Sequence, residues 1–314
     1  MKKMKAIQIH QYGGPEVLQL EEAPRPAVEA GELLVRVHAA GVNPVDWKTR
    51  AGRGLAGRYG SDQFPLILGW DISGIVQEVG PGVSGFEIGD AVFGMPRFPG
   101  VAAAYAEYTA VPAAEVTHKP DSLSHVQAAA LPLVSLTAWQ ALFEAADLQA
   151  GNKILIHAAA GGVGHVAVQL AKWRNAFVIG TASARNADYL AEIGVDQFVD
   201  YQSQRFEDVV SEVDVVLDTM SGETRQRSWG VLQPGGSLVS ILGQPPAGTA
   251  VQFGVRSTSI LVYPDGSQMA QIAALVDSGT IKPHVDAVFP LAEAAQAHEY
   301  VHRGHTRGKV VLEL

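Results

Sequence analysis

The residues of this 314-residue sequence that are best suited to chemistry lie in a glycine-rich segment near its middle. An apolar run, residues 154–156, leads through His157 into Ala158-Ala159-Ala160-Gly161-Gly162-Val163-Gly164, and a predicted helix over 163–172 follows at once. A buried strand that runs through glycines into a helix is the setting of a dinucleotide-binding fingerprint. The helix N-terminus would stabilise the negative charge of a bound pyrophosphate.

Each glycine of this segment has an expected task. Gly161 would let the backbone approach the pyrophosphate, and Gly164 would let the helix pack closely on the strand. Ala159 takes the place of the usual first glycine, which weakens the motif. A glycine-rich turn between a strand and a helix can also be purely structural, and the motif alone leaves that alternative open.

The end of the next predicted strand bears on which nicotinamide cofactor is bound. Proteins that prefer NAD place Asp or Glu there, about 20 residues after the glycines, to bond the ribose 2′-hydroxyl. This chain instead reads Gly180-Thr181-Ala182-Ser183-Ala184-Arg185-Asn186, which offers small residues, a hydroxyl and a guanidinium suited to a phosphate dianion. The segment therefore favours NADP(H), although Arg185 could also simply open a solvated helix.

The surrounding sequence predicts the elements that hold these residues. The first third reads as short strands, at 5–10, 33–40 and 71–79, and helical spacing follows between Ser124 and Phe143. Buried strands are then predicted at 154–157, 177–181, 214–218, 237–242 and 260–263, with helices such as 163–172 and 187–193 between them. This alternation predicts an α/β fold with a doubly wound parallel sheet. A last helix, 291–303, and a strand, 309–314, could return to the first domain.

Composition excludes several other classes of protein. Hydrophobic residues make up 47% and charged residues 18%, which is typical of a globular protein with a large interior. The formal net charge of -9 makes nucleic acid a poor partner. No segment has the roughly 20 apolar residues of a membrane helix, so we expect a soluble, cytoplasmic protein without a membrane partner. The absence of cysteine rules out disulfides, thiolate catalysis and zinc ligation by cysteine.

Taken in order, the motifs resemble the medium-chain dehydrogenase/reductase superfamily, in its zinc-free quinone oxidoreductase branch, which includes enone reductases. The segments that carry the resemblance are 13–18 (GGPEVL), 39–46 (AAGVNPVD), 79–80 with 89–90, 131–138 (LPLVSLTA), the glycine-rich segment and 308–311 (GKVV). The resemblance implies a GroES-like, β-rich catalytic domain over residues 1–122 and 282–314. It further implies a Rossmann NADP-binding domain over 123–281, with the active site in the cleft between the two.

Two positions separate this chain from the zinc alcohol dehydrogenases that it also resembles. Asn43 stands where those enzymes carry their first zinc-ligating Cys, and Gly69-Trp70-Asp71 stands where they carry Gly-His-Glu. We therefore expect no metal site. Without a Lewis acid, oxidation of a simple alcohol loses several kcal/mol of charge stabilisation, which argues against that reaction.

The resemblance also implies roles for individual residues. It implies a nicotinamide contact for Thr137, 2′-phosphate contacts for Ser183, Arg185 and Tyr201, and a place near the cofactor phosphates for Lys309. We also expect Leu242 and Gly243, at the end of the strand predicted over 237–242, to contact the cofactor. Tyr201 could instead cap a strand, and Lys309 could be a solvent-exposed lysine.

The expected reaction is hydride transfer from NADPH to a quinone or to the β-carbon of an enone, which leaves negative charge on the acceptor oxygen. Lys48 lies where relatives have a Tyr or His that reaches the nicotinamide ribose or the substrate, so we expect its ammonium to stabilise that charge or relay a proton. Asn43 could orient the substrate, and Trp47 and Trp70 could form an apolar wall for a planar acceptor. A surface role for Lys48 and a core role for both tryptophans remain alternatives.

Two other functions fit the same sequence. The first is an NADPH-binding sensor or structural protein with little turnover, because an intact cofactor loop would serve both roles. The second is a metal-independent reductase of aldehydes or ketones. The resemblance also implies a homodimer formed through the edge of the Rossmann sheet, for which residues 259–263 are the candidate edge.

Overall fold

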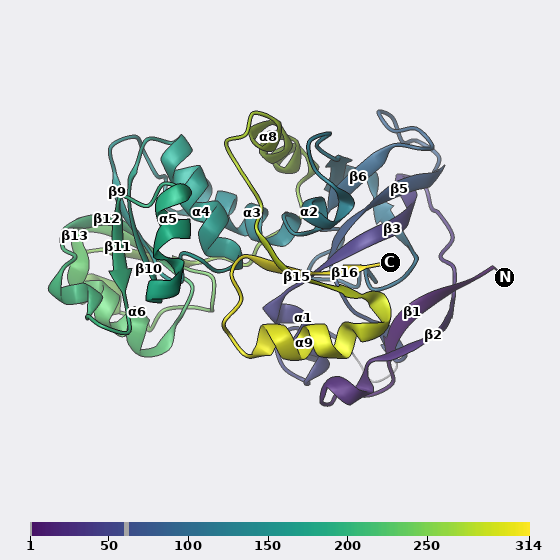
Figure 1. The fold of residues 1–314 in the computed structure, drawn as a ribbon, viewed down its shortest axis with the longest axis horizontal. Coiled ribbons are helices and arrows are strands. Elements are labelled where there is room, and N and C mark those ends of the chain that lie inside the picture. The colour runs from purple at the N-terminus through teal and green to yellow at the C-terminus, as the bar shows by residue number, and fades with distance from the viewer. Residues whose placement is uncertain (1, 60–62) are drawn as a thin grey trace. The chain divides into compact units, whose positions relative to one another are not determined.

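The computed structural model describes residues 2–59 and 63–314, and the chain within it forms two units (Figure 1). The first unit consists of Met1–Leu133, Tyr263–Gly279 and Pro283–Leu314. The second consists of Val134–Val262 and Thr280–Lys282. Both ends of the chain therefore belong to one unit, and the second unit is an insertion between them.

The first unit is built mainly on antiparallel strands, and its one parallel pair among the described residues is β15 with β16. Its larger sheet has the order β15-β16-β3-β5-β6-β8, with β7 paired to β3, and its smaller sheet has the order β2-β1-β4. The strands are β1 (Lys3–Ile9), β2 (Gln19–Pro24), β3 (Glu32–Val42), β4 (Leu66–Ile67), β5 (Asp71–Val79), β6 (Ala91–Gly94), β7 (Tyr108–Pro112), β8 (Val116–His118), β15 (Val285–Pro290) and β16 (Lys309–Glu313). The helices are α1 (Pro44–Arg50), α2 (His125–Ala129), α8 (Gly266–Asp277) and α9 (Ala294–His302).

The last strand joins the two chain ends. β16 pairs antiparallel with β3, with Val310 opposite Val42 and Leu312 opposite Ala40. All four of these side chains are buried, so the pairing removes apolar surface from both ends of the sequence at once. The predicted return of the C-terminal strand to the first domain is confirmed.

The second unit is a parallel sheet with the order β11-β10-β9-β12-β13-β14. Its strands are β9 (Lys153–Ile156), β10 (Phe177–Ala182), β11 (Gln197–Asp200), β12 (Val213–Asp218), β13 (Leu232–Ser240) and β14 (Arg256–Ser259). Its helices are α4 (Gly162–Trp173), α5 (Ala187–Glu192), α6 (Gly222–Ser228) and α7 (Thr249–Gln252), and α3 (Pro132–Trp139) continues as a π-helix over Gln140–Ala145. This order is that of a doubly wound sheet whose winding reverses between β9 and β12. The predicted fold class is confirmed.

Two expectations about boundaries differ from the structure. Residues 123–133 and 263–279 lie in the first unit, because α2 packs on β3 and α8 packs on β8, where Gly266 closely approaches the backbone of Ala114 and Val116. The sixth strand is the polar Arg256–Ser259, and the apolar residues 260–263 that we predicted as a strand have no regular structure. An edge strand pairs on one side only, so polar residues suffice to form it. The strand β11 was not predicted.

Candidate cofactor-binding site

The glycine-rich segment forms the predicted strand, turn and helix. β9 ends at Ile156, a turn follows, and α4 begins at Gly162 with Gly161 as its N-cap residue. The Gly161 amide donates to the Ala158 carbonyl at 2.8 Å, which closes the turn. A Cβ on Gly164 would lie 2.3 Å from that same carbonyl oxygen, so only glycine fits there. The first amide groups of an α-helix have no partner within the helix, and this is the arrangement that binds phosphate.

Ala159, the departure from the usual glycine, is accommodated by a neighbouring strand. Its amide donates to the Thr181 carbonyl of β10 at 2.9 Å, and its side chain is buried. The space that its methyl group requires is left by Gly180, where a Cβ would lie 3.0 Å from the Ala159 Cβ. The turn therefore keeps its close packing although the first glycine is missing. Ala160 is also buried, whereas Gly162 and Val163 are partly exposed at the start of α4.

The residues predicted to contact a 2′-phosphate lie at the carboxyl ends of two adjoining strands. β10 and β11 pair with Ala182 opposite Asp200, so Ser183 and Tyr201 leave the sheet side by side. The Tyr201 amide donates to the Ala182 carbonyl at 3.3 Å, and its side chain is 57% exposed. Arg185, two residues beyond Ser183, is also exposed. The structure thus brings these three residues to one edge of the second unit.

A pocket opens beside this edge. Its lining begins at Tyr201 and continues through Gln202, Ser203, Gln204, Arg205, Phe206, Asp208 and Arg227. Both arginines bond the carboxylate of Glu207, Arg205 at 2.8 Å and Arg227 at 3.0 Å. The pocket is polar, which suits the adenosine end of a dinucleotide better than an apolar substrate.

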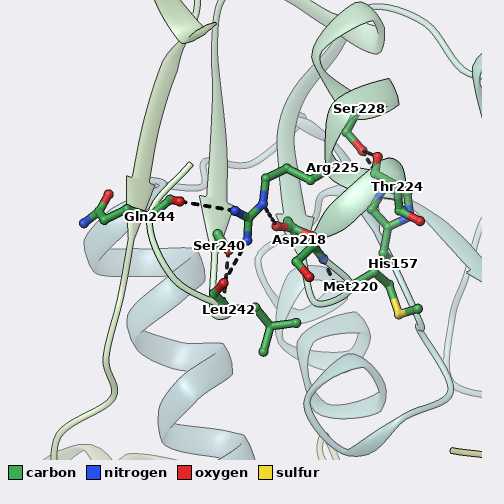
Figure 2. Close-up of polar contacts among 10 residues, drawn as sticks. His157, Asp218, Met220, Thr224, Arg225, Ser228, Ser240, Leu242 and Gln244 are labelled. Atoms are coloured by element: carbon green, nitrogen blue, oxygen red, sulfur yellow. Dashed lines mark hydrogen bonds and ion pairs between the residues drawn. The ribbon is translucent and has the colours of Figure 1, made fainter. Parts of the chain in front are cut away.

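A buried ion pair that the sequence analysis missed lies at the carboxyl ends of β12 and β13 (Figure 2). Asp218 ends β12, and Arg225 on α6 donates to its carboxylate at 2.5 Å. Arg225 also donates to the Leu242 carbonyl at 3.0 Å, and so contacts the loop that carries the predicted cofactor residues Leu242 and Gly243. The signal in the sequence was an acidic residue at the end of an apolar strand, followed by a glycine turn at Gly222.

His157 links β9 to two other elements of the second unit. Its ring nitrogens lie 3.2 Å from the Thr181 hydroxyl and 2.9 Å from the Ser228 hydroxyl, and it is buried. Burial lowers the pKa of His157 to about 4, so the imidazole is neutral at physiological pH. These contacts give His157 a structural role within the second unit. Thr137, the predicted nicotinamide contact, is buried in α3.

In the first unit, Asn43 and Lys309 belong to one buried polar cluster. The side-chain amide of Asn43 donates to the Asp71 carboxylate at 2.8 Å. The Lys309 ammonium donates to the Val42 carbonyl at 2.8 Å and to the Asn43 side chain, and it lies 3.4 Å from Asp71. Burial lowers the pKa of Lys309 and raises that of Asp71, and each charge opposes the shift of the other.

The position of Lys309 differs from both readings of the sequence. We expected a contact with cofactor phosphates or a solvent-exposed lysine, but the side chain is 3% exposed and bonded to oxygens of its own unit. Lys309 is the first residue of the buried, hydrophobic strand β16, so its side chain lies inside the unit. The buried carboxylate of Asp71 compensates its charge. We therefore leave Lys309 out of the phosphate site proposed below. The Asn43 side chain is likewise occupied by Asp71 and Lys309.

Asp46 extends this cluster. One carboxylate oxygen accepts hydrogen bonds from the backbone N–H of Asn43 at 2.6 Å and from the Tyr105 hydroxyl at 2.8 Å. The other has no hydrogen-bond partner among the residues that the structure describes. Burial raises the pKa of Asp46 to about 7, against the hydrogen bonds from Asn43 and Tyr105 and the charge of Lys309. His298 lies 3.2 Å beyond Tyr105, and burial lowers its pKa to about 3.

The remaining candidates of the first unit lie at different depths. Lys48 is partly exposed on α1, with its ammonium 5.6 Å from the Trp47 ring centre. Trp47 is partly exposed and packs against His302, with ring centres 4.4 Å apart and the rings tilted by 36°. Trp70 is 2% exposed, donates to the Gly100 carbonyl at 2.6 Å and packs against Phe98. Trp70 is therefore a core residue, and of the two tryptophans only Trp47 has surface available for a substrate.

The fold and this site together define a class of protein. A doubly wound sheet with a glycine-rich turn after its first strand, inserted into an antiparallel β unit built from both chain ends, is the architecture of a two-domain dinucleotide-binding protein. Within residues 2–59 and 63–314, no three His, Asp or Glu side chains gather as metal ligands. No helix in those same residues combines the length and apolar composition needed to cross a membrane.

Comparisons with known proteins identify the family. The alcohol dehydrogenase GroES-like domain family matches residues 29–121, and the zinc-binding dehydrogenase family matches residues 193–312. The chain is 32% identical to the mitochondrial NAD(P)H oxidoreductase RTN4IP1 of Danio rerio, over 99% of this chain and 91% of that protein. It is 33% identical to the chloroplastic NADPH-dependent alkenal/one oxidoreductase of Arabidopsis thaliana, over 99% of this chain and 80% of that protein.

Among solved structures, the quinone oxidoreductase from Coxiella burnetii is 37% identical, with a TM-score of 0.91 and complete coverage of both chains (100% each). The chain therefore belongs to the medium-chain dehydrogenase/reductase superfamily, in its quinone oxidoreductase branch. It is an oxidoreductase that uses a nicotinamide dinucleotide.

Proposed function

We propose that this chain is a zinc-independent, NADPH-dependent oxidoreductase that transfers hydride to quinones or to the C=C bond of α,β-unsaturated carbonyl compounds. The observation that carries the NADPH preference is the edge formed by Ser183, Arg185 and Tyr201, which offers hydroxyls and a guanidinium and has no carboxylate between residues 180 and 186. The names of the Arabidopsis and Coxiella relatives, an alkenal/one oxidoreductase and a quinone oxidoreductase, support the two acceptor classes.

We assign the binding of the cofactor to the second unit. Gly161 and Gly164 keep the turn free of side chains, and the N-terminus of α4 provides amides for the pyrophosphate. Thr137, Leu242 and Gly243 are the proposed contacts of the nicotinamide half. When bound, the cofactor supplies the hydride.

In the first unit, we assign the acceptor side of the reaction to Lys48 and Trp47. The Lys48 ammonium stabilises the negative charge that develops on the acceptor oxygen, and the Trp47 ring provides an apolar surface for a planar acceptor. Asn43 and Asp71 stand where a zinc enzyme would place a ligand and its neighbour, and here they bond each other and Lys309. This bonding supports a reaction without a metal.

Steady-state kinetics with a metal chelator present throughout test the proposal. NADPH and NADH oxidation are measured against 9,10-phenanthrenequinone, 1,4-benzoquinone, a short alkenal and an alkyl vinyl ketone. Chelator-insensitive turnover that prefers NADPH is the expected result, and the better acceptor distinguishes quinone from enone. No turnover with any of these acceptors, with NADPH binding intact, would favour an NADPH-binding sensor or structural protein. Reversible alcohol oxidation would favour an aldehyde or ketone reductase.

We further propose a cytoplasmic homodimer that joins through the edge of the parallel sheet. Among the strands of residues 2–59 and 63–314, β14 pairs only with β13, and Leu261, just beyond it, is exposed. Unpaired amides and carbonyls of an edge strand favour pairing with a second copy. Sedimentation of the purified chain at two concentrations checks this, and a concentration-independent monomer would contradict it.

A further inference from the structure

The guanidinium of Arg225 donates hydrogen bonds to four acceptors in the interior of the second unit. Arg225 is 8% exposed. Its Nε donates to Asp218 at 2.5 Å, Nη2 donates to the Ser240 hydroxyl at 2.7 Å and the Leu242 carbonyl at 3.0 Å, and Nη1 donates to the Gln244 carbonyl at 3.3 Å. Figure 2 shows the side chain reaching from α6 across the end of β12 to the loop that follows β13.

Asp218 holds the neighbouring loop through its other oxygen. That oxygen accepts from the Met220 amide at 3.1 Å and the Ser221 amide at 2.8 Å. Ser221 has a φ of 57°, a strained conformation for a non-glycine residue that persists only when its surroundings impose it. The pair therefore determines the course of residues 219–222 after β12 as well as residues 241–244 after β13.

Both loops lie at the part of the sheet that receives the second half of a dinucleotide. In a doubly wound sheet, the ligand lies across the carboxyl ends of the strands at the point where the winding reverses, and each half of the sheet binds one mononucleotide. β9, β10 and β11 form the half with the glycine-rich turn and the residues proposed for the 2′-phosphate. β12, β13 and β14 form the other half, which faces the nicotinamide mononucleotide.

Stability alone does not explain a buried pair of this kind. Taking two charges out of water is costly, and well-packed apolar residues of similar volume often replace a buried ion pair without loss of stability. What an apolar replacement lacks is the planar, forked geometry of the guanidinium, which directs donors at several acceptors at once. Here two of those acceptors are main-chain carbonyls, of Leu242 and Gln244, on either side of Gly243.

We propose that Arg225 and Asp218 are positioning residues that hold the loops after β12 and β13 in the shape that binds the nicotinamide half of the cofactor. This inference rests on the proposed function. It predicts that loss of the forked guanidinium weakens binding of the whole dinucleotide but leaves binding of its adenosine half unchanged.

Binding of NADPH and of 2′,5′-ADP, which carries only the adenosine half with its 2′-phosphate, tests the inference by isothermal titration. The Arg225→Lys variant keeps the charge and loses the fork, and Ser240→Ala removes one acceptor while leaving the ion pair. Arg256→Met, an exposed arginine on β14 of the same unit, is the matched control. We expect Arg225→Lys to weaken NADPH about tenfold or more and Ser240→Ala to weaken it less, with 2′,5′-ADP within about twofold of wild type.

Each other outcome has a definite meaning. Equal weakening of NADPH and 2′,5′-ADP would show a general disturbance of the unit and would overturn the positioning role, as would unchanged NADPH binding in both variants. Failure of the wild-type chain to bind NADPH would overturn the proposed function, and the inference with it. If Arg225→Lys loses its cooperative thermal transition, its binding data are set aside and Ser240→Ala decides between these outcomes.

Discussion

Gly180 of β10 leaves open the space that the methyl group of Ala159 occupies: a Cβ on Gly180 would lie 3.0 Å from the Ala159 Cβ. The two residues lie in the cofactor turn and in the strand beside it. A departure from the dinucleotide fingerprint at one position is thus accommodated by a missing side chain at another.

This relationship predicts a coupling between the two positions. Gly180→Ala should lower the free energy of unfolding by about 1–3 kcal/mol through overpacking. Adding Ala159→Gly should recover part of that loss, because it removes the methyl group in contact, while Val195 at 3.1 Å keeps the recovery incomplete. Urea unfolding of the four proteins in the cycle gives the coupling energy. Gly230→Ala, which meets no atom within 4 Å, is the control, and strictly additive losses would contradict the relationship.

The proposed 2′-phosphate edge predicts a selective loss of NADPH. Arg185→Ala should weaken NADPH by about 10- to 100-fold, since a hydrogen bond to a charged group contributes about 1.5–3 kcal/mol. NADH carries no 2′-phosphate and should bind as before. Fluorescence titration with both cofactors measures the ratio, and Arg256→Ala serves as control for the removal of an exposed positive charge. Equal losses for the two cofactors would refute the assignment.

The proposed role of Lys48 predicts that its removal lowers turnover without weakening cofactor binding. Lys48→Ala should reduce kcat by about 100-fold, within the range of a positioned acid or charge-stabilising group, and leave the NADPH Kd nearly unchanged. Arg53→Ala is the matched control, because Arg53 is a second cation beside the same ring, 5.5 Å from the Trp47 ring centre. Pre-steady-state and steady-state rates measure the effect. An unchanged rate in Lys48→Ala would remove the residue from the mechanism.

The buried carboxyl of Asp46 predicts a pH-dependent stability. Its pKa is about 7 in the folded chain and 3.8 ordinarily, so between these values the folded state holds a proton that the unfolded state does not. The stability that Asp46 contributes is therefore complete below pH 3.8 and falls as the pH rises to 7, by up to about 4 kcal/mol. Asp46→Asn mimics the protonated carboxyl, so the free energy of unfolding of this variant should exceed that of wild type by an amount that grows across that window.

Urea unfolding of wild type and Asp46→Asn at a series of pH values measures this difference. His157 and His298, whose pKa values burial lowers, contribute stability that rises with pH through part of the same window. Their contribution is common to both proteins and cancels in the difference. A difference that stays constant with pH would show that Asp46 is ionised throughout.

The local parts of the fold and site could be read from the sequence because a few neighbouring residues determine them. An apolar strand, glycines without room for a Cβ and an apolar helix face predict the turn at Gly161 and Gly164. Residues 180–186, with no carboxylate, are the basis of the proposed preference for NADPH. Strand β5 begins and ends where the spacing of β-branched residues predicted.

What only the tertiary structure decided are the contacts between residues far apart in the chain. Lys309 and Asp71 are 238 residues apart, and the pairing of β16 with β3 is what places that lysine in the interior. Arg225, already bonded to Asp218 in the adjoining strand, reaches Ser240 and Leu242 only because β12 and β13 are neighbours in the sheet. A charged residue has the same local pattern whether it faces water or a buried partner. Its environment is determined by the strand order, which arises from the burial of all the apolar faces together.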